Sequence, residues 1–278
     1  MSGSGDPEAM DLIAAFNDLQ AAARYAEGPH RFVPGYESLH RMNAILLAEG
    51  TPADARVLVL GAGGGLELRA LAEAQSAWFF VGVDPAREMR REAERALGLL
   101  MDRVTLVEGY IDDAPVSPFD AAACLLTLHF LEPAEREATV RKIRQRLKPG
   151  APFVAAHGSF PQIDDERHVW LDRYEAYAVA SGTDPAQAHS ARTAVGANLP
   201  TLAPEQDADI LRADGFSNVA LFCGLYMARV GRSSMTATGC ECHLEWIVGP
   251  AELKFGSSPS ISSERSGKGS LPLDCLSV

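Results

Sequence analysis

Five residues between an apolar segment and a helical pattern have the composition of a ligand-binding loop. They are Gly-Ala-Gly-Gly-Gly, residues 61–65. Glycine has no Cβ, so this loop can take positive φ angles and let a ligand approach the backbone closely. The helix expected from Leu66 would point its N-terminal amides at the same ligand. A glycine cluster alone is a weak signal, and its G-x-G-x-G spacing differs from the G-x-G-x-x-G of nicotinamide-dependent oxidoreductases.

An aspartate at the end of the next apolar segment strengthens this interpretation. Asp84 closes residues 78–84, and at the tip of a neighbouring strand its carboxylate could accept hydrogen bonds from both hydroxyls of a ribose. The alternative is an N-cap for the helix that Pro85 is expected to start. The order of strand, glycine loop, helix, strand and acid favours the ribose role.

Two histidines follow later apolar segments. His129 lies just beyond the expected fourth strand, and His157 ends the fifth. Imidazole titrates near neutral pH, so it suits a base that removes a proton from a substrate. We expect His129 to be catalytic and His157 to line the substrate pocket. The alternative for His129 is a packing or hydrogen-bonding role in a loop.

Short apolar segments alternate with helical patterns and must position these groups. Unbroken apolar runs indicate strands covered on both faces, and the alternation indicates parallel pairing. The sequence therefore predicts a doubly wound α/β fold. We expect strands at 56–60, 78–84, 104–109, 119–128 and 151–160, and helices at 9–24, up to Gly50, at 66–74, from Pro85 and at 132–150.

The chain divides into five segments by pattern and composition. We expect an N-terminal helical segment (1–50), a cofactor-binding core (51–160), a helical lid insertion (161–203), the end of the α/β core (204–248) and a disordered serine-rich tail (249–278). The insertion carries Trp170, Tyr174 and Tyr177 at helical spacing. These aromatic side chains could form only the core of a small helical subdomain, or could form that core and also a wall of the pocket. A final strand would have to come from 242–249 after a long loop. Without it, the open sheet edge would favour a homodimer.

Bulk properties exclude several classes. The net charge of −12 argues against sequence-independent nucleic-acid binding. No apolar run is long enough to cross a membrane, and the N-terminus lacks a signal-peptide pattern. Five scattered cysteines fit a reducing cytoplasm. Cys240, Cys242 and His243 lack a second ligand pair, so we expect no metal site.

Several segments together resemble the motifs of class I S-adenosylmethionine-dependent methyltransferases. They are VLVLGAGGG, VGVDP, VEGYIDDAP, FDAAACLLTLHFL and LKPGAPFV. The resemblance implies a mostly parallel seven-stranded sheet whose last strand is antiparallel. It implies S-adenosylmethionine as the cofactor, lying across the carboxyl ends of the first four strands. The matching cofactor residues are Tyr36, Gly61, Ala62, Gly63, Gly65, Asp84, Pro85, Tyr110, Ile111 and Leu126.

Two positions depart from that pattern. Tyr110 stands where many members have an aspartate for the adenine amino group, so Asp112 or Asp113 would take that role while Ile111 packs on the ring. Leu60 stands where an acid often contacts the cofactor's amino group, so loop carbonyls would hold the amine instead.

Two further segments, RFVPGYESL and LTLHFLEPAERE, are similar to segments of bacterial carboxy-S-adenosylmethionine synthases. This resemblance implies cofactor or substrate contacts for Tyr36 and Arg31, and a carboxylate-binding role for Arg192 through its planar guanidinium. The alternative for Arg192 is a solvated helix residue. The asparagine and glutamine of that family are Leu125 and His129 here.

The sequence therefore predicts methyl transfer to a small-molecule acceptor that it does not identify. We expect that substrate to contact Arg31, His157, Trp170, Tyr174 and Arg192. The alternatives are a carboxy-S-adenosylmethionine synthase-like enzyme and a non-catalytic S-adenosylmethionine-binding protein.

Overall fold

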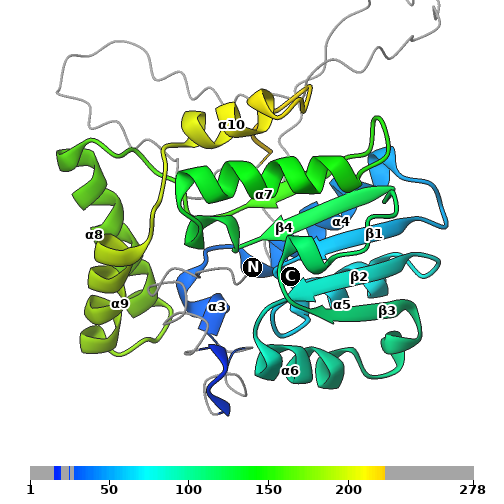
Figure 1. The fold of residues 1–278 in the computed structure, drawn as a ribbon. Coiled ribbons are helices and arrows are strands. Elements are labelled where there is room, and N and C mark those ends of the chain that lie inside the picture. Colours follow the sequence, from blue (N-terminus) through cyan, green and yellow to red (C-terminus); the bar gives the residue numbers. More distant parts are fainter. Residues whose placement is uncertain (1–15, 20–24, 26–27, 223–278) are drawn as a thin grey trace, which may run out of the picture. The chain divides into compact units, whose positions relative to one another are not determined.

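The computed structural model describes residues 16–19, 25 and 28–222 (Figure 1). Its strands are β1 (Arg56–Leu60), β2 (Phe79–Asp84), β3 (Val104–Glu108), β4 (Ala121–Leu125) and β5 (Phe153–Ala156). Its α-helices are α3 (Gly28–Phe32), α4 (Tyr36–Gly50), α5 (Leu66–Ala74), α6 (Arg87–Leu97), α7 (Pro133–Arg146), α8 (Asp164–Ala180), α9 (Pro185–Asn198) and α10 (Pro204–Ala213). Short 3-10 helices are η2 (Gly98–Arg103), η3 (Ile111–Asp113) and η4 (Leu128–Phe130).

The five strands form one parallel sheet in the order β3-β2-β1-β4-β5. In this register Leu60 pairs with Val83 and Asp84 with Glu108, so β1, β2 and β3 end close to one level. The chain order reverses between β1 and β4. That switch point is where ligands bind in open α/β sheets, outside the carboxyl ends of the strands.

Alternate residues of the strands pack into two separate hydrophobic cores, one on each face of the sheet. Val57 and Val59 face the core built with α4, α5 and α6, whereas Leu58 and Leu60 face the core built with α7 and α10. The sheet is therefore covered on both faces, as its apolar runs predicted (Figure 1). The doubly wound, Rossmann-like arrangement is confirmed.

The insertion after β5 forms a helix pair beside the sheet (Figure 1). Asp184 caps α9 by accepting hydrogen bonds from the amides of Ala186 at 3.0 Å and Gln187 at 3.1 Å. The Tyr174 ring of α8 stacks on Phe32 of α3, with ring centroids 5.6 Å apart. The predicted helical character of this segment is confirmed, and its role as a lid stays a proposal.

The expected number of strands differs from what the structure describes. Five strands are present in residues 28–222, where seven were expected, and residues 219–222 after α10 are not in a strand. Phe222 packs against the core on the α4 side, so this segment contributes side-chain burial without strand pairing. The last-strand candidate at 242–249, the tail at 249–278 and most of the 9–24 helix lie outside the described residues.

A buried ion pair connects α7 to α10. Arg136, 1% exposed, donates to Asp207 Oδ1 at 2.5 Å and to the carbonyl of Pro200 at 2.7 Å. Burial alone would raise the pKa of Asp207, but the hydrogen bond from His157 and the positive charges around it hold that pKa below its ordinary value. The pair therefore fixes α10 and the loop before it against the sheet.

Replacing Arg136 should destabilise the fold strongly, because the Asp207 carboxylate would stay buried without its cation. We expect Arg136→Met to lower the free energy of unfolding by about 3–5 kcal/mol in urea titrations. The control is Lys142→Ala on the same helix, which removes the exposed pair with Asp112 and should leave the urea midpoint nearly unchanged. Equal midpoints for the two variants would contradict a stabilising role for the buried pair.

Candidate active site

A pocket of about 180 Å³ lies at the switch point between β1 and β4. Its walls come from the glycine loop, the ends of β2 and β4, the segments after β3 and β4, and the N-terminal residues Phe16 and Tyr25. The lining residues are Phe16, Tyr25, Leu60, Gly61, Gly63, Asp84, Pro85, Ala86, Met89, Gly109, Tyr110, Ile111, Leu125, Leu126, Thr127, Phe130, Leu131 and Thr139.

The glycine loop is fastened to the end of β2. The amides of Gly61 and Ala62 both donate to the carbonyl of Val83, at 2.9 and 3.1 Å. Gly61, Gly63 and Gly65 all have positive φ, at 73°, 47° and 79°, which only glycine adopts without strain. Gly61 and Gly63 line the pocket, whereas Ala62 is buried and Gly65 serves as the N-cap of α5.

Asp84 holds the loop and faces the pocket at once. Its Oδ2 accepts from the Gly63 amide and its Oδ1 from the Ala86 amide, both at 2.9 Å. Burial raises the pKa of this carboxyl, and the two backbone hydrogen bonds partly offset that rise. Each oxygen keeps a further lone pair, so the carboxylate can also accept from a ligand's hydroxyls. The two alternatives for Asp84, ribose contact and local capping, are geometrically compatible.

The segment after β3 forms another wall. Gly109 has φ 145°, and the Asp113 carboxylate accepts from the Tyr110 amide at 2.8 Å. Ile111 is buried and Tyr110 is 53% exposed, and both line the pocket. Asp112 pairs with Lys142 at 2.6 Å, and neither Asp112 nor Asp113 lines the pocket. Ile111 is therefore placed to pack on a planar ligand, and the two aspartates are engaged elsewhere.

The end of β4 approaches the glycine loop from the other side. Leu126 lines the pocket with φ 54°, an uncommon backbone conformation for a non-glycine residue. A Cβ on Gly61 would lie 1.9 Å from Thr127 Oγ1, so Thr127 occupies the space that the glycine leaves. The bare backbone at Gly61 thus admits the β4 loop as well as a ligand.

Tyr25 is the pocket residue that sequence reasoning missed. Its hydroxyl lies 3.5 Å from the position of a Cβ built on Gly63, and its ring covers Gly64. Burial, with the charges of Asp84 and Glu67, raises the pKa of Tyr25 to about 12, so the phenol stays protonated. Tyr36, the expected N-terminal contact, is buried against His30 and His40 and does not line the pocket. No local pattern distinguishes these two tyrosines.

The two histidines belong to a polar cluster with Arg136 and Asp207, and neither of them lines the pocket. His129 Nδ1 accepts the Gly158 amide at 2.9 Å, so the neutral ring carries its proton on Nε2. Burial, then the neighbouring His157 and Arg136, lowers the pKa of His129 to about 3. His157 Nε2 lies 3.0 Å from Asp207 Oδ2, and His157 Nδ1 is buried without a hydrogen-bond partner. This arrangement makes His129 a hydrogen-bond donor and not a proton acceptor.

The other expected substrate contacts lie away from the pocket walls. Arg192 pairs with Asp172 at 2.6 Å and Glu175 at 3.4 Å, between α9 and α8. The Arg173 guanidinium lies over the Trp170 ring, 4.6 Å from the ring centroid. Arg31 is exposed on α3. Burial raises the pKa of the Tyr174 phenol to about 12. The structure does not bring Arg31, Trp170, Tyr174 and Arg192 together around the pocket.

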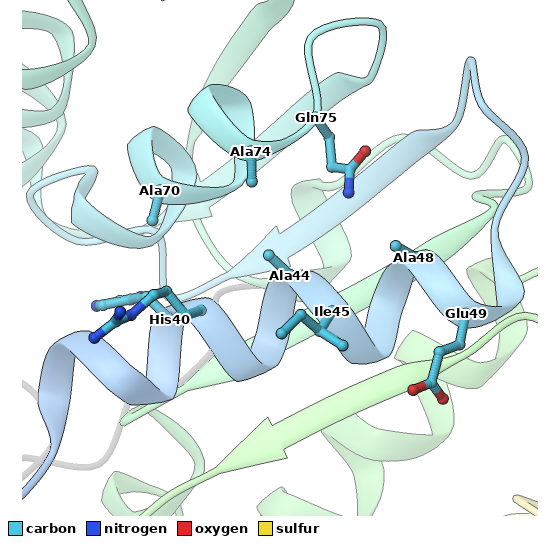
Figure 2. Close-up of a pocket in the computed structure, with 9 residues that line it drawn as sticks. His40, Ala44, Ile45, Ala48, Glu49, Ala70, Ala74 and Gln75 are labelled. Carbon is cyan, nitrogen blue, oxygen red and sulfur yellow. The ribbon is translucent and has the colours of Figure 1, made fainter. Parts of the chain in front are cut away.

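A second hollow lies between α4 and α5 and has a volume of about 530 Å³ (Figure 2). Alanines from the two helices form much of its wall, with His40 toward one end and Glu49 and Gln75 toward the other (Figure 2). It contains no residue of the glycine loop and no strand end. Its lining is therefore mainly apolar, and the pocket at the switch point, which contains the glycine loop and Asp84, is the better candidate.

The described residues contain no group of three or more His, Cys, Asp or Glu side chains that could hold a metal ion. Cys240, Cys242 and His243 lie outside them. Within the same part of the chain, no helix has the length and apolar character needed to cross a membrane.

Comparison with known families identifies the core. Residues 57–150 match the model of the methyltransferase domain, and this stretch includes the glycine loop, Asp84 and the end of β4. The carboxy-S-adenosyl-L-methionine synthase of Chromohalobacter salexigens is 27% identical over 217 residues, which cover 76% of this chain and 80% of the relative. The synthase of Campylobacter concisus is 25% identical over 204 residues, covering 73% and 87%.

Solved structures share the fold. An O-methyltransferase family protein from Burkholderia thailandensis has a TM-score of 0.53 at 15% identity, covering 74% of this chain and 57% of that one. Human N-acetylserotonin methyltransferase, in complex with SAM, has a TM-score of 0.51 at 14% identity, covering 77% and 55%. The resemblance seen in the motifs is confirmed for the core: residues 57–150 match a methyltransferase domain, and the fold is shared with these methyltransferases.

The role of Gly65 can be tested against a second glycine of positive φ. A Cβ on Gly65 would lie 2.8 Å from the Ala93 backbone, whereas one on Gly150, with φ 78°, would meet nothing within 4 Å. Gly150→Ala should cost about 1–2 kcal/mol from backbone strain alone. Gly65→Ala should cost about 1–3 kcal/mol more, because α5 and α6 must separate. Urea titration measures both, and equal losses would contradict close packing at Gly65.

Proposed function

We propose that this protein binds S-adenosylmethionine in the pocket at the switch point and transfers its methyl group to a small-molecule acceptor. The observation that carries the proposal is the pairing of the glycine loop with the buried carboxylate of Asp84 on one pocket. Gly61 and Gly63 allow a ligand close to the backbone, and Asp84 offers free lone pairs beside them. In this proposal Asp84 accepts the ribose hydroxyls and Ile111 packs on the adenine.

The cofactor supplies a methyl group on a positively charged sulfur, and the chain's task is to orient it and the acceptor. Transfer is an in-line displacement, so positioning provides much of the rate enhancement. The cofactor's reactive end belongs beside the carboxyl end of β4, where Leu125, Leu126 and Thr127 line the pocket. This apolar wall would exclude water from the site. We expect the enzyme to act in the cytoplasm.

For the base that an acceptor requires, we propose His157 in place of His129. His129 Nδ1 is already occupied by the Gly158 amide. His157 stands at the end of β5, with Nε2 3.0 Å from the Asp207 carboxylate. That neighbour favours a proton on Nε2, so the lone pair that could take a proton is on the buried Nδ1. His129 Nε2–H then remains a donor that can orient an acceptor, and α8 and α9 form the nearby lid.

A second candidate, synthesis of carboxy-S-adenosylmethionine, is favoured by the curated relatives, which align over most of this chain and carry that activity in their names. The residues that distinguish it argue against it. Arg192 is held by Asp172 and Glu175 and does not line the pocket. Leu125 provides an apolar side chain where that family has an amide. We therefore keep methyl transfer as the proposal.

The ribose contact can be tested by replacing one oxygen of Asp84. We expect Asp84→Asn to weaken S-adenosylmethionine binding by about 1–3 kcal/mol, because a charge-assisted hydrogen bond to a hydroxyl is lost. Isothermal titration calorimetry measures the affinity, and thermal melting shows whether the variant is folded. Asp102→Asn, at an exposed position, is the control. A folded Asp84→Asn protein with wild-type affinity would contradict the ribose assignment.

The two candidate reactions predict different bound molecules. Native mass spectrometry of the purified protein, followed by denaturation, should release S-adenosylmethionine or S-adenosylhomocysteine. Arg192→Ala should retain the same molecule, since Arg192 lies outside the pocket. A released mass larger by one carboxylate, and its loss in Arg192→Ala, would instead support the synthase reaction.

A further inference from the structure

A carboxylate with no cation beside it is buried next to the glycine loop. Glu67 is 6% exposed and is the second residue of α5, two residues after Gly65. Helical side chains lean toward the N-terminus, so this carboxyl group is directed back toward the loop. Among the described residues, no lysine or arginine forms an ion pair with it. A carboxyl group buried without a cation is costly to ionise, so its ionised form calls for a positively charged partner.

The neighbours of Glu67 give it two hydrogen-bond donors and leave one acceptor unmatched. Asn43, fully buried on α4, donates its Nδ2 to Glu67 Oε1 at 2.8 Å. The backbone of Leu125 at the end of β4 gives a second hydrogen bond. The other polar atom of the amide, Asn43 Oδ1, is buried with no hydrogen-bond partner. The group that would satisfy both Glu67 and Asn43 Oδ1 is therefore a donor of several N–H bonds.

Glu67 and Asn43 do not line the cofactor pocket themselves, and Leu125 connects Glu67 to it. Leu125, which bonds Glu67, lines the pocket, and so does Tyr25, whose phenol experiences the charges of both Asp84 and Glu67. The other titratable groups that experience Glu67 are Tyr36 on α4 and the Cys124 thiol on β4. Burial raises the pKa of all three groups, so they stay neutral. The positive charge must come from a ligand.

Burial raises the pKa of Glu67 to about 8, although the bonds from Asn43 and Leu125 oppose the rise. Near neutral pH the empty site therefore holds a mostly protonated carboxyl. A cation placed against it would favour the ionised form and bring the pKa down. The end of β1 offers no other carboxylate for such a cation, because the last residue of β1, directly before Gly61, is Leu60.

We propose that Glu67 and Asn43 Oδ1 bind the ammonium group at the methionine end of the cofactor. This inference rests on the proposed function and assigns a residue to that part of the site. An ammonium carries one positive charge and three N–H donors, which match the unpaired carboxylate and the unpaired amide oxygen. Loop carbonyls then no longer have to hold the amine alone.

The test compares two adenosine ligands. S-adenosylhomocysteine has the ammonium group but no sulfonium charge, and 5′-methylthioadenosine lacks the whole amino acid part. We expect Glu67→Gln to weaken S-adenosylhomocysteine binding by about 10- to 100-fold and to leave 5′-methylthioadenosine binding unchanged. Glu49→Gln, an exposed residue of α4, is the matched control and should bind both ligands as the wild type does.

Proton release provides a readout that a merely structural role would not move. At about pH 6.5 the wild-type protein should release about one proton when it binds S-adenosylhomocysteine, because Glu67 must ionise. The release should fade as the pH rises through about 8, where the free carboxyl is already ionised. Glu67→Gln should release none. Calorimetry in buffers of different ionisation enthalpy counts these protons.

The outcomes separate this inference from the proposed function. Wild-type protein that binds neither ligand would overturn the proposed function and this inference with it. Unchanged S-adenosylhomocysteine affinity in Glu67→Gln, or an equal loss for both ligands, would overturn only the role of Glu67.

Discussion

The carbonyl of Val83 is the point on which the site depends. It accepts two successive amides of the glycine loop, from Gly61 and Ala62, and so joins the end of β1 to the end of β2. Two adjacent N–H groups can converge on one oxygen only where the chain turns sharply, which the positive φ at Gly61 allows. The next residue of β2 is Asp84, whose carboxylate then receives the Gly63 amide. Loop shape and acid position are thus one structural unit.

Three buried ionisable sites among the described residues are handled differently. Arg136 and Asp207 neutralise each other and join two helices. His129 loses its charge, since burial and its neighbours favour the neutral ring. Glu67 has neither a cation nor a low pKa, and it lies beside a pocket. The first two arrangements are complete within the chain, so they serve stability and shape. In our proposal the third is completed by the bound ammonium group, which would make it part of a site.

The sequence predicted those parts of the molecule that local patterns determine. Apolar runs located all five described strands, and the order of glycine loop and Asp84 located the pocket. Contacts between distant segments were not predictable. Tyr25 covers the loop while Tyr36 does not, and both occur in unremarkable helical surroundings. Arg192 looked suited to a carboxylate ligand, but its partners Asp172 and Glu175 come from another helix of the insertion. Tertiary packing determines which side chains contact one another in such cases, and the spacing of residues along the chain does not reveal these contacts.

The contact between Gly61 and Thr127 has an evolutionary consequence. Because the threonine side chain fills the space above a residue that has none, the loop after β1 and the loop after β4 share one volume. A larger residue at position 61 is acceptable only if position 127 becomes smaller or its loop moves. The two positions should therefore covary among homologues, and a chimera that exchanges one loop without the other would bring two side chains into the same space.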